Sequence, residues 1–304
     1  MDRQKVLAIV GPTGIGKTSL SVWLAKQLDG EIISCDSMQV YKKMDIGTAK
    51  VTREEMQGIH HELIDVQNYN EPYNVKVFQE KCRTAIEDVV KRGKFPILCG
   101  GTGLYLKAAL YDYEFQEENE DIAHTTFLNS KTNEELVAML KEKDEKALEK
   151  IHPNNRKRLI RALQICHSGT SKSEQEDKQQ HIPLYDVYFL GLDVNRDILH
   201  DRINKRVDIM FENGLVKEVK DLFTNPETWE YTSFQGIGYK EFKDYFLKEK
   251  SIDEVKTAIK THSRQYAKRQ YTWFKNQMPV HWFEAQNRDE IYSAVKEWLM
   301  DEDK

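Results

Sequence analysis

The sequence has few cysteines, and the four that occur are widely separated: Cys35, Cys82, Cys99 and Cys166. This spacing argues against a zinc cluster or a disulfide framework and favours reduced thiols. A long apolar run is also missing, because no stretch approaches the roughly 18 residues that a membrane-spanning helix needs. The apolar run near the N-terminus is too short for a signal peptide. We therefore expect a cytoplasmic protein with no membrane segment.

An excess of positive charge is absent as well. The 304 residues include 45 Lys and Arg against 50 Asp and Glu, a formal net charge of -5. This balance argues against a generally basic coat for nucleic acid but leaves local patches open. No coiled-coil heptads occur, so we expect a monomer. With 39% apolar and 31% charged residues, the chain has the composition of a globular protein of one large domain or two moderate ones.

Short apolar runs alternate with helical patterns along the chain. Residues 6–10 form a run that stops at Gly11, and a helix is expected over Lys17–Leu28. Further strands are expected to end near Ser34 and at Cys99, and another is expected over Leu184–Leu192. Alternation of this kind predicts an α/β fold, with a parallel sheet flanked by helices.

The composition changes between Glu114 and Glu149, where acidic residues outnumber basic ones by 11 to 4 and Gly and Pro are absent. This indicates a helical insertion. A helix with Pro153 in its first turn is expected to follow, and then a mobile polar loop over 168–180. We expect a core of residues 1–113 and 182–304, mostly helical after the last strand, and a small inserted all-α domain of residues 114–181.

The segment Gly11–Thr18 reads GPTGIGKT and fits the pattern G-x-x-x-x-G-K-S/T between a strand and a helix. Such a loop turns its backbone N–H groups and the helix N-terminus toward phosphate oxygens, Lys17 adds a positive charge, and Thr18 can place its hydroxyl on Mg²⁺. The alternative is a tight turn with an accidental lysine. Nucleoside triphosphates are common ligands, but any diphosphate ester with Mg²⁺ meets the same requirements. The predicted phosphate-binding residues are Gly11, Pro12, Thr13, Gly14, Ile15, Gly16, Lys17 and Thr18.

Asp36 lies two residues beyond the expected end of the second strand. The carboxyl ends of parallel strands face the ligand crevice, so this carboxylate should lie near the phosphate loop, where it could hold Mg²⁺ or act as a general base. The alternative is a helix N-cap before Ser37. Asp45 fits a turn, and Cys35 fits a small buried residue.

A second glycine-rich loop follows the strand that ends at Cys99, with Thr102 within it. It should lie at the same edge of the sheet as the phosphate loop. Close backbone packing is an equally good explanation for its glycines, which are Gly100, Gly101 and Gly103.

Two segments of this acidic chain contain Lys and Arg but no Asp or Glu. The first, 152–165, contains Arg156, Lys157, Arg158 and Arg161, and the second, 256–275, contains Lys256, Lys260, Arg264, Lys268, Arg269 and Lys275. Aromatic residues are interleaved with the second. Lys and Arg hold phosphates while aromatic rings stack on bases, so the pattern favours RNA, although aromatic residues at helical spacing are also typical of a core.

Taken together, these motifs resemble the tRNA dimethylallyltransferase (tRNA isopentenyltransferase) family over nearly the whole chain. The matching segments, in the order of the family, are GPTGIGKT, SCDSMQVYKKMDIGTAK, HHELIDV, CGGTGLYLKAAL, HPNNRKRLIRAL, DRINKRVDIM, GIGYKE and SRQYAKRQYTWF. Gly14 and Ile15 depart from the Ala and Ser that are frequent in the family. No family motif is evident over Glu114–Glu149.

The resemblance implies a P-loop NTPase-like core and transfer of a dimethylallyl group from dimethylallyl diphosphate to the exocyclic amine of the adenine 3′ to the anticodon of tRNA. Asp36 matches the general base, Arg206 matches a residue on the diphosphate oxygens, and Thr13 matches the substrate pocket. Mg²⁺ on Thr18 is the implied cofactor, and the tRNA anticodon stem-loop is the implied partner. The implied tRNA-binding residues are Asp36, Ser37, Met38, Gln39, Thr102, Arg156, Lys157, Arg158, Leu159, Ile160, Arg161, Arg264, Lys268 and Arg269.

Three alternatives remain. A kinase or nucleotidyl enzyme would use ATP and could hold Mg²⁺ with Asp193. A non-catalytic RNA-binding module with a degenerate loop would not need Lys17, Thr18 and Asp36 together. A transferase acting on a free adenine nucleotide would have no use for the two basic segments.

Overall fold

The computed structural model describes residues 3–115, 121–174 and 181–301. The chain divides into two compact units. The first consists of Met1–Tyr111 and Pro183–Lys304, and the second of Asp112–Ile182. Among the described residues, no helix combines the length and apolarity needed to cross a membrane.

The first unit is built on a six-stranded sheet in the order β3-β2-β4-β1-β5-β6, and each neighbouring pair is parallel. The predicted α/β class is confirmed, and so are the four predicted strands. The two strands at the sheet edges were missed, because β3 has only two residues and β6 reads His-Trp-Phe-Glu, with polar ends. The strands are β1 (Lys5–Val10), β2 (Gly30–Ser34), β3 (His61–Glu62), β4 (Phe95–Gly100), β5 (Asp186–Asp193) and β6 (His281–Glu284).

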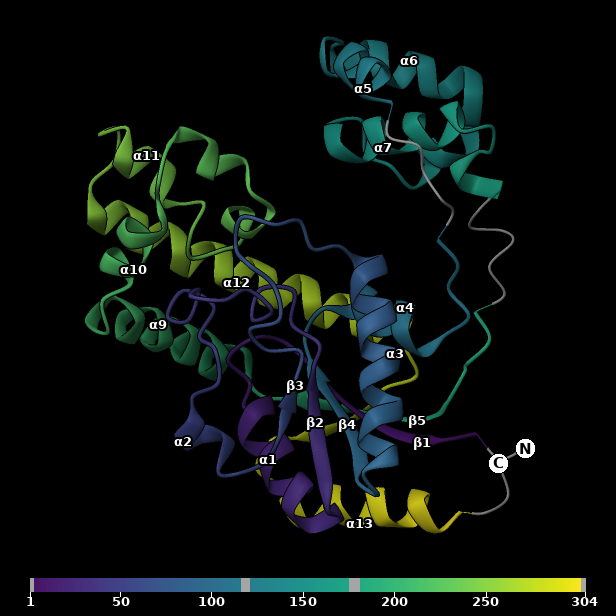
Figure 1. Ribbon diagram of the computed structural model, residues 1–304, viewed down its shortest axis with the longest axis vertical. Coiled ribbons are helices and arrows are strands. Elements are labelled where there is room, and N and C mark those ends of the chain that lie inside the picture. Colours follow the sequence, from purple (N-terminus) through teal and green to yellow (C-terminus); the bar gives the residue numbers. More distant parts are fainter. Residues whose placement is uncertain (1–2, 116–120, 175–180, 302–304) are drawn as a thin grey trace. The chain divides into compact units, whose positions relative to one another are not determined.

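Both faces of the sheet are covered, and β1 shows why. Successive side chains of a strand point to opposite faces. Val6, Ala8 and Val10 therefore pack with α3 and α4, while Leu7 and Ile9 pack with α1 and α13. The pair α1 and α13 can be followed at the lower edge of Figure 1. These helices are α1 (Lys17–Leu28), α3 (Val75–Lys91), α4 (Gly103–Leu110) and α13 (Arg288–Met300).

The remainder of the first unit is mostly helical, as predicted. The 26-residue helix α12 starts at a capping box between Ser251 and Glu254 and buries Val255, Ile259 and Phe274 on one face. It packs along α9 (Figure 1). The other elements are α2 (Arg53–Met56), α9 (Arg196–Glu212), α10 (Leu215–Leu222), α11 (Phe242–Phe246) and α12 (Ile252–Gln277), with 3₁₀ turns η2 (Pro226–Glu230) and η3 (Thr232–Gln235).

The second unit is helical and has its own apolar core, which includes Leu128, Leu136, Leu140 and Leu159. One prediction is wrong, because Pro153 precedes the last helix rather than lying in its first turn. The Asn155 side chain accepts a hydrogen bond from the backbone N–H of Arg158 and so starts the helix later. The elements are α5 (Ile122–Asn129), α6 (Asn133–Asp144), η1 (Glu145–Glu149) and α7 (Arg156–His167).

The predicted loop over 168–180 is only partly described, because residues 175–180 lie outside the described residues. Within its described part, the Ser173 hydroxyl donates to Asp144 Oδ1 at 2.6 Å, and the Ser173 backbone N–H donates to Oδ2 at 3.0 Å. The end of α6 therefore anchors this part of the segment.

Candidate active site

The phosphate loop connects β1 to α1, as its pattern predicts. Gly16 is the N-cap of α1 with φ of 106°, and Gly14 has φ of 79°. Residues with a Cβ rarely adopt such angles, so glycine is favoured at both positions. The loop therefore presents the N-terminus of α1 at the carboxyl edge of the sheet, where an anion is stabilised by the helix dipole.

Lys17 curls over this loop. Its Nζ donates to the carbonyl oxygens of Gly11 at 2.9 Å and of Pro12 at 2.8 Å. Burial of the ammonium lowers the pKa of Lys17 to about 8, although the nearby charge of Asp36 acts in the opposite direction. The lysine is thus held at the loop as a cation that a bound anion would stabilise.

Arg206 reaches the same loop from α9. Its Nη1 donates to Thr13 Oγ1 at 3.0 Å, and its Nη2 lies 3.3 Å from the Thr48 carbonyl oxygen. Burial lowers the pKa of Arg206, and the negative charge of Asp36 partly offsets this shift. Three residues singled out in the sequence, Thr13, Arg206 and Asp36, therefore share one electrostatic site.

Asp36 follows β2 and closes a turn. Its Oδ1 accepts hydrogen bonds from the backbone N–H groups of Met38 at 2.8 Å and Gln39 at 3.2 Å. No helix starts here in the described chain, so the helix N-cap interpretation is wrong, although the side chain does bond the backbone as a cap would. Among the described residues, none donates a hydrogen bond to Oδ2.

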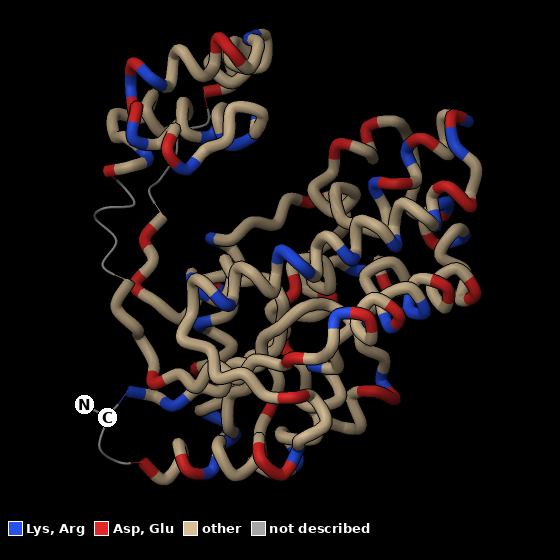
Figure 2. Tube along the Cα trace, turned by 180° about the vertical axis from the view of Figure 1, so that it is seen from behind, with Lys and Arg blue, Asp and Glu red and all other residues tan. Residues whose placement is uncertain are grey.

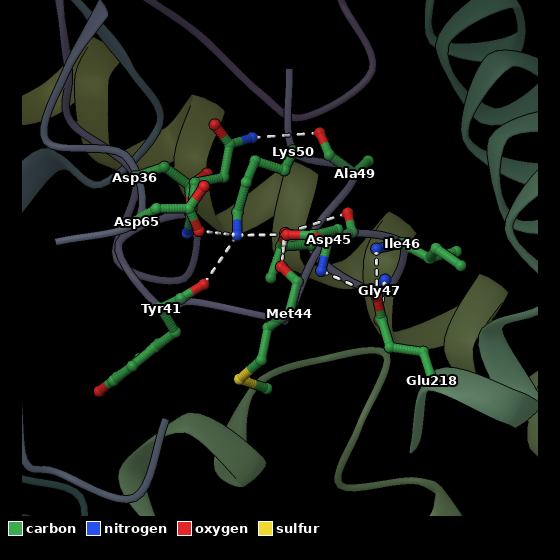
Figure 3. Close-up of polar contacts among 12 residues, drawn as sticks. Asp36, Tyr41, Met44, Asp45, Ile46, Gly47, Ala49, Lys50, Asp65 and Glu218 are labelled. Atoms are coloured by element: carbon green, nitrogen blue, oxygen red, sulfur yellow. Dashed lines mark hydrogen bonds and ion pairs between the residues drawn. The ribbon is translucent and has the colours of Figure 1, made fainter. Parts of the chain in front are cut away.

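The segment after Asp36 forms a loop that Lys50 ties together. Lys50 Nζ lies 2.7 Å from the Tyr41 carbonyl oxygen and 2.6 Å from a carboxylate oxygen of both Asp45 and Asp65 (Figure 3). The Lys50 side chain is only 6% exposed. Asp45 thus has the turn role that its sequence context suggested, and the loop has a buried cation at its centre.

Glu218 of α10 holds the same loop from the other side. Its carboxylate accepts the backbone N–H groups of Asp45, Ile46 and Gly47 at 2.7–2.9 Å, as Figure 3 shows. Its Oε1 also accepts the Tyr239 hydroxyl at 2.7 Å. Burial and the charge of Glu218 raise the pKa of Tyr239, so this phenol remains a donor. Sequence reasoning missed Glu218, since a glutamate on an amphipathic helix carries no local signal.

The glycine-rich loop after β4 is explained by close packing. A Cβ on Gly100 would lie 2.3 Å from the Cys35 carbonyl oxygen, and a Cβ on Gly103 would lie 2.0 Å from the Trp273 ring. Thr102 in this loop faces Ser37, with 3.5 Å between their hydroxyl oxygens. The loop therefore adjoins the turn of Asp36. Cys35 is fully buried, as predicted, and the four cysteines are free thiols.

Gln270 of α12 links the two glycine-containing loops and was also missed. Its Oε1 accepts the backbone N–H of Thr13 at 2.9 Å, and its Nε2 donates to the Gly101 carbonyl oxygen at 2.9 Å. The matching segment SRQYAKRQYTWF contains this residue, but nothing local marks one glutamine in a basic and aromatic helix as part of a site.

Two other residues of the Asp36 segment have structural contacts. Met38 packs tightly against Gly236, where a Cβ would lie 2.3 Å from Met38 Cε. The Gln39 side chain donates to the Ala49 carbonyl oxygen at 3.2 Å. Both residues therefore help to hold the segment after Asp36 in its conformation.

The basic residues of the two segments differ in their contacts and their exposure. On α12, where Figure 2 shows basic residues recurring, Lys256 and Lys260 each lie 2.7 Å from Asp208 of α9, whereas Lys268 and Arg269 are exposed. Arg264 is half-buried and bonded to Asn204.

In the second unit, Arg156 is committed to structure, because its guanidinium donates to the carbonyl oxygens of Asn129 and Lys131. Leu159 is fully buried in the core of the unit, so its side chain is closed to a ligand, and Ile160 is half-buried. The exposed basic residues of α7 are Lys157, Arg158 and Arg161.

Asp193, the metal ligand of the kinase alternative, ends β5. Its Oδ2 accepts the Tyr271 hydroxyl at 3.2 Å, and its Oδ1 accepts the backbone N–H of Val194 at 2.8 Å. Both oxygens are thus engaged by protein donors.

Fold and site define an α/β protein of the P-loop type. Its phosphate loop, a carboxylate and a half-buried arginine meet at the carboxyl edge of a parallel sheet. A family model described as IPP transferase matches residues 39–277. A curated tRNA dimethylallyltransferase from Bacillus anthracis is 48% identical over 301 residues, which cover 97% of this chain and 96% of the relative. The chain belongs to the tRNA dimethylallyltransferase (IPP transferase) family and is an enzyme of the transferase class.

Solved structures agree with this assignment. The full-length tRNA isopentenylpyrophosphate transferase from Bacillus halodurans matches with a TM-score of 0.73 at 42% identity, covering 98% of this chain and 97% of that chain. A structure of a eukaryotic dimethylallyltransferase acting on tRNA matches with a TM-score of 0.82 at 32% identity, covering 97% of this chain and 79% of that chain.

Proposed function

We propose that the protein transfers a dimethylallyl group from dimethylallyl diphosphate to the N6 amine of the adenine that is 3′-adjacent to the anticodon of tRNA. The observation that carries this proposal is the grouping of Lys17, Arg206 and Thr13 around the phosphate loop, with Asp36 within electrostatic reach of both cations. A diphosphate leaving group and an amine that must lose a proton need these two kinds of group side by side.

The diphosphate half of the reaction belongs to the loop Gly11–Thr18. When the allylic carbon–oxygen bond breaks, its electron pair leaves with the diphosphate. Lys17 and Arg206 then stabilise the growing negative charge, together with backbone N–H groups at the start of α1. Thr13 holds the Arg206 guanidinium in place through the 3.0 Å hydrogen bond.

The amine half belongs to Asp36. As the carbon–nitrogen bond forms, the N6 amine loses a proton, and Asp36 Oδ2 accepts it. The adenine must leave the stack of the anticodon loop to reach this carboxylate. Thr102 and Ser37, whose hydroxyl oxygens lie 3.5 Å apart beside the turn, provide polar groups for the extruded base.

The residues present suit a magnesium ion. Thr18 is exposed in the first turn of α1, next to Lys17, and a hydroxyl at this position of a P-loop is a usual magnesium ligand. When bound, Mg²⁺ neutralises charge on the diphosphate.

The exposed basic residues of both units serve tRNA binding in this proposal. Lys268 and Arg269 of α12 and Lys157, Arg158 and Arg161 of α7 hold backbone phosphates of the anticodon stem-loop, so the inserted helical unit, residues 114–181, acts as a tRNA-binding domain. If the substrate were instead a free adenine nucleotide, charge reversal at Arg158 and Arg161 would leave turnover unchanged. We expect the protein to act as a monomer in the cytoplasm.

The test is mass spectrometry of nucleosides from unmodified tRNA incubated with the purified protein and Mg²⁺. One sample receives dimethylallyl diphosphate and a parallel sample receives ATP. Prenylated adenosine formed only with the allylic donor supports the proposal. An unchanged tRNA with ATP consumed instead would show that the loop serves a nucleotide.

A further inference from the structure

Gln270 is a buried polar residue at the meeting point of three segments. It is 7% exposed and lies on α12, yet its side chain bonds to the phosphate loop and to the loop after β4. Both amide atoms are used, because Oε1 accepts from Thr13 N and Nε2 donates to Gly101 O, each at 2.9 Å. A buried amide with one donor and one acceptor in use is orientation-specific.

The packing around the amide leaves little freedom. A Cβ on Gly101 would lie 2.2 Å from Gln270 Nε2, so a side chain at this position would displace the amide. Thr13 is held at two atoms, since its N–H donates to Gln270 and its Oγ1 accepts from Arg206 at 3.0 Å. The amide of Gln270 therefore sets where Thr13, and with it the Arg206 guanidinium, lies.

The Nε2 atom of Gln270 contacts the loop that is assigned to the adenine. Gly101 directly precedes Thr102, whose hydroxyl oxygen lies 3.5 Å from that of Ser37, the neighbour of Asp36. One side chain thus joins the loop assigned to the diphosphate with the loop assigned to the base. Reaction between two bound substrates is sensitive to such spacing, and a displacement of about 1 Å can cost 10²-fold in rate.

We propose that Gln270 is a positioning residue whose amide fixes the separation of the two loops, and with it the approach of the allylic carbon to the adenine amine. The inference rests on the proposed function. In this proposal α12 has two roles. Its exposed residues Lys268 and Arg269 bind tRNA, and Gln270, buried in the same helix turn, positions the groups for the chemical step.

A glutamate in place of Gln270 separates positioning from packing. Gln270→Glu keeps the shape and can still accept from Thr13 N, but its ionised carboxylate places an oxygen against the Gly101 carbonyl. Protonation restores the donor, and burial raises the pKa of a carboxyl group, so any recovery of this variant should appear toward acid pH. Gln270→Met keeps a similar volume and removes both hydrogen bonds at every pH.

Gln79 provides a matched control. It is also 7% exposed, lies on α3, and donates from Nε2 to the Ala108 carbonyl oxygen at 2.8 Å, so its amide supports the end of α4. Gln79→Glu introduces the same chemical change into the same core without touching either loop of the site.

The measurement is the single-turnover rate of adenosine prenylation at saturating tRNA and dimethylallyl diphosphate, from pH 6 to 8.5, for each variant relative to wild type. We expect Gln270→Glu to lose about 10²-fold at the alkaline end and to recover toward wild type as pH falls. Gln270→Met should lose rate at all pH values with tRNA affinity near wild type, and its melting temperature should fall because Thr13 N–H and Gly101 C=O lose their partner. For Gln79→Glu, the single-turnover rate relative to wild type should not change with pH.

A Gln270→Met protein that is folded at the assay temperature and retains its rate overturns the inference. So does a Gln270→Glu protein that keeps the wild-type rate at every pH. Should Gln270→Glu fail to fold, the prenylation rate of the apolar Gln270→Met variant still tests whether Gln270 is a positioning residue. A wild-type protein that forms no prenylated adenosine contradicts the proposed function itself and removes the basis of the inference, so the two failures give different results.

Discussion

The guanidinium of Arg206 lies 3.0 Å from the hydroxyl oxygen of Thr13, although 193 positions separate the two residues in the sequence. The fold brings a helix that follows the insertion back onto the first loop of the chain. This hydrogen bond, with the contact to the Thr48 carbonyl oxygen, turns Arg206 toward the loop Gly11–Thr18 and supports its proposed role on the diphosphate.

Arg206→Lys keeps a positive charge but not the planar group that contacts Thr13 and Thr48 together. We expect a decrease of about 10²-fold in the single-turnover rate, the usual effect of removing one donor to a developing anion. The control is Lys205→Ala on the same helix, since Lys205 is exposed and pairs with Asp201. Equal rates for the two variants would remove Arg206 from the site.

Lys17 should give the reaction an alkaline limit. Burial places its pKa at about 8, below the ordinary value of 10.5, so free enzyme loses this positive charge as pH rises through 8. We expect kcat/KM for dimethylallyl diphosphate to fall above pH 8, and the fall to begin at higher pH in Lys17→Arg. An unchanged alkaline limit in Lys17→Arg would assign the titration to another group.

Asp36→Asn tests the general base with little change in shape. The amide oxygen can still accept from the Met38 and Gln39 N–H groups, so the turn should persist. We expect tRNA affinity to be retained and the single-turnover rate to fall by roughly 10²-fold or more, the usual contribution of a general base. Unchanged turnover would exclude Asp36 from proton transfer.

The bond between Tyr239 and Glu218 should matter for folding. Tyr239→Phe removes a 2.7 Å hydrogen bond to a carboxylate in a fully buried position. A decrease of about 1.5–3 kcal/mol in the free energy of unfolding is expected from urea denaturation. Tyr292→Phe is the control, because the ring of Tyr292, on α13, is half-buried against Trp23 of α1. Equal midpoints for both variants would show that the hydroxyl contributes nothing.

The strands and the phosphate loop were predictable because their signals are local. The apolar run of β1, the glycines and the start of α1 follow one another between Lys5 and Lys17, and each has a direct physical reason. Asp36 could be placed near the loop by the rule for strand ends alone. Its turn was less predictable, since the same side chain could cap a helix or close a turn.

Glu218 and Gln270 were not predictable from their neighbours in the chain. Their partners lie 171 and 257 positions away, at Gly47 and Thr13. Such contacts depend on how α10 and α12 pack, and a single polar side chain on a helix does not encode this. The basic segments show the same limit, because pairing of Lys256 and Lys260 with Asp208 becomes visible only in the fold.

That pairing leads to a test of the proposed RNA-binding face of α12. Lys268 and Arg269 are exposed, so their double replacement by Gln should weaken tRNA binding and reduce the slope of log Kd against log salt by about 0.7–0.9 for each phosphate that is no longer neutralised. Replacement of both Lys256 and Lys260 by Gln removes the same number of charges but should have a smaller effect, because both lie 2.7 Å from the Asp208 carboxylate. Filter binding at several salt concentrations gives both the Kd for tRNA and the slope of log Kd against log salt. Equal weakening in the two proteins would mean that only total charge attracts the RNA, and an unchanged slope in the double variant would place the RNA on another surface.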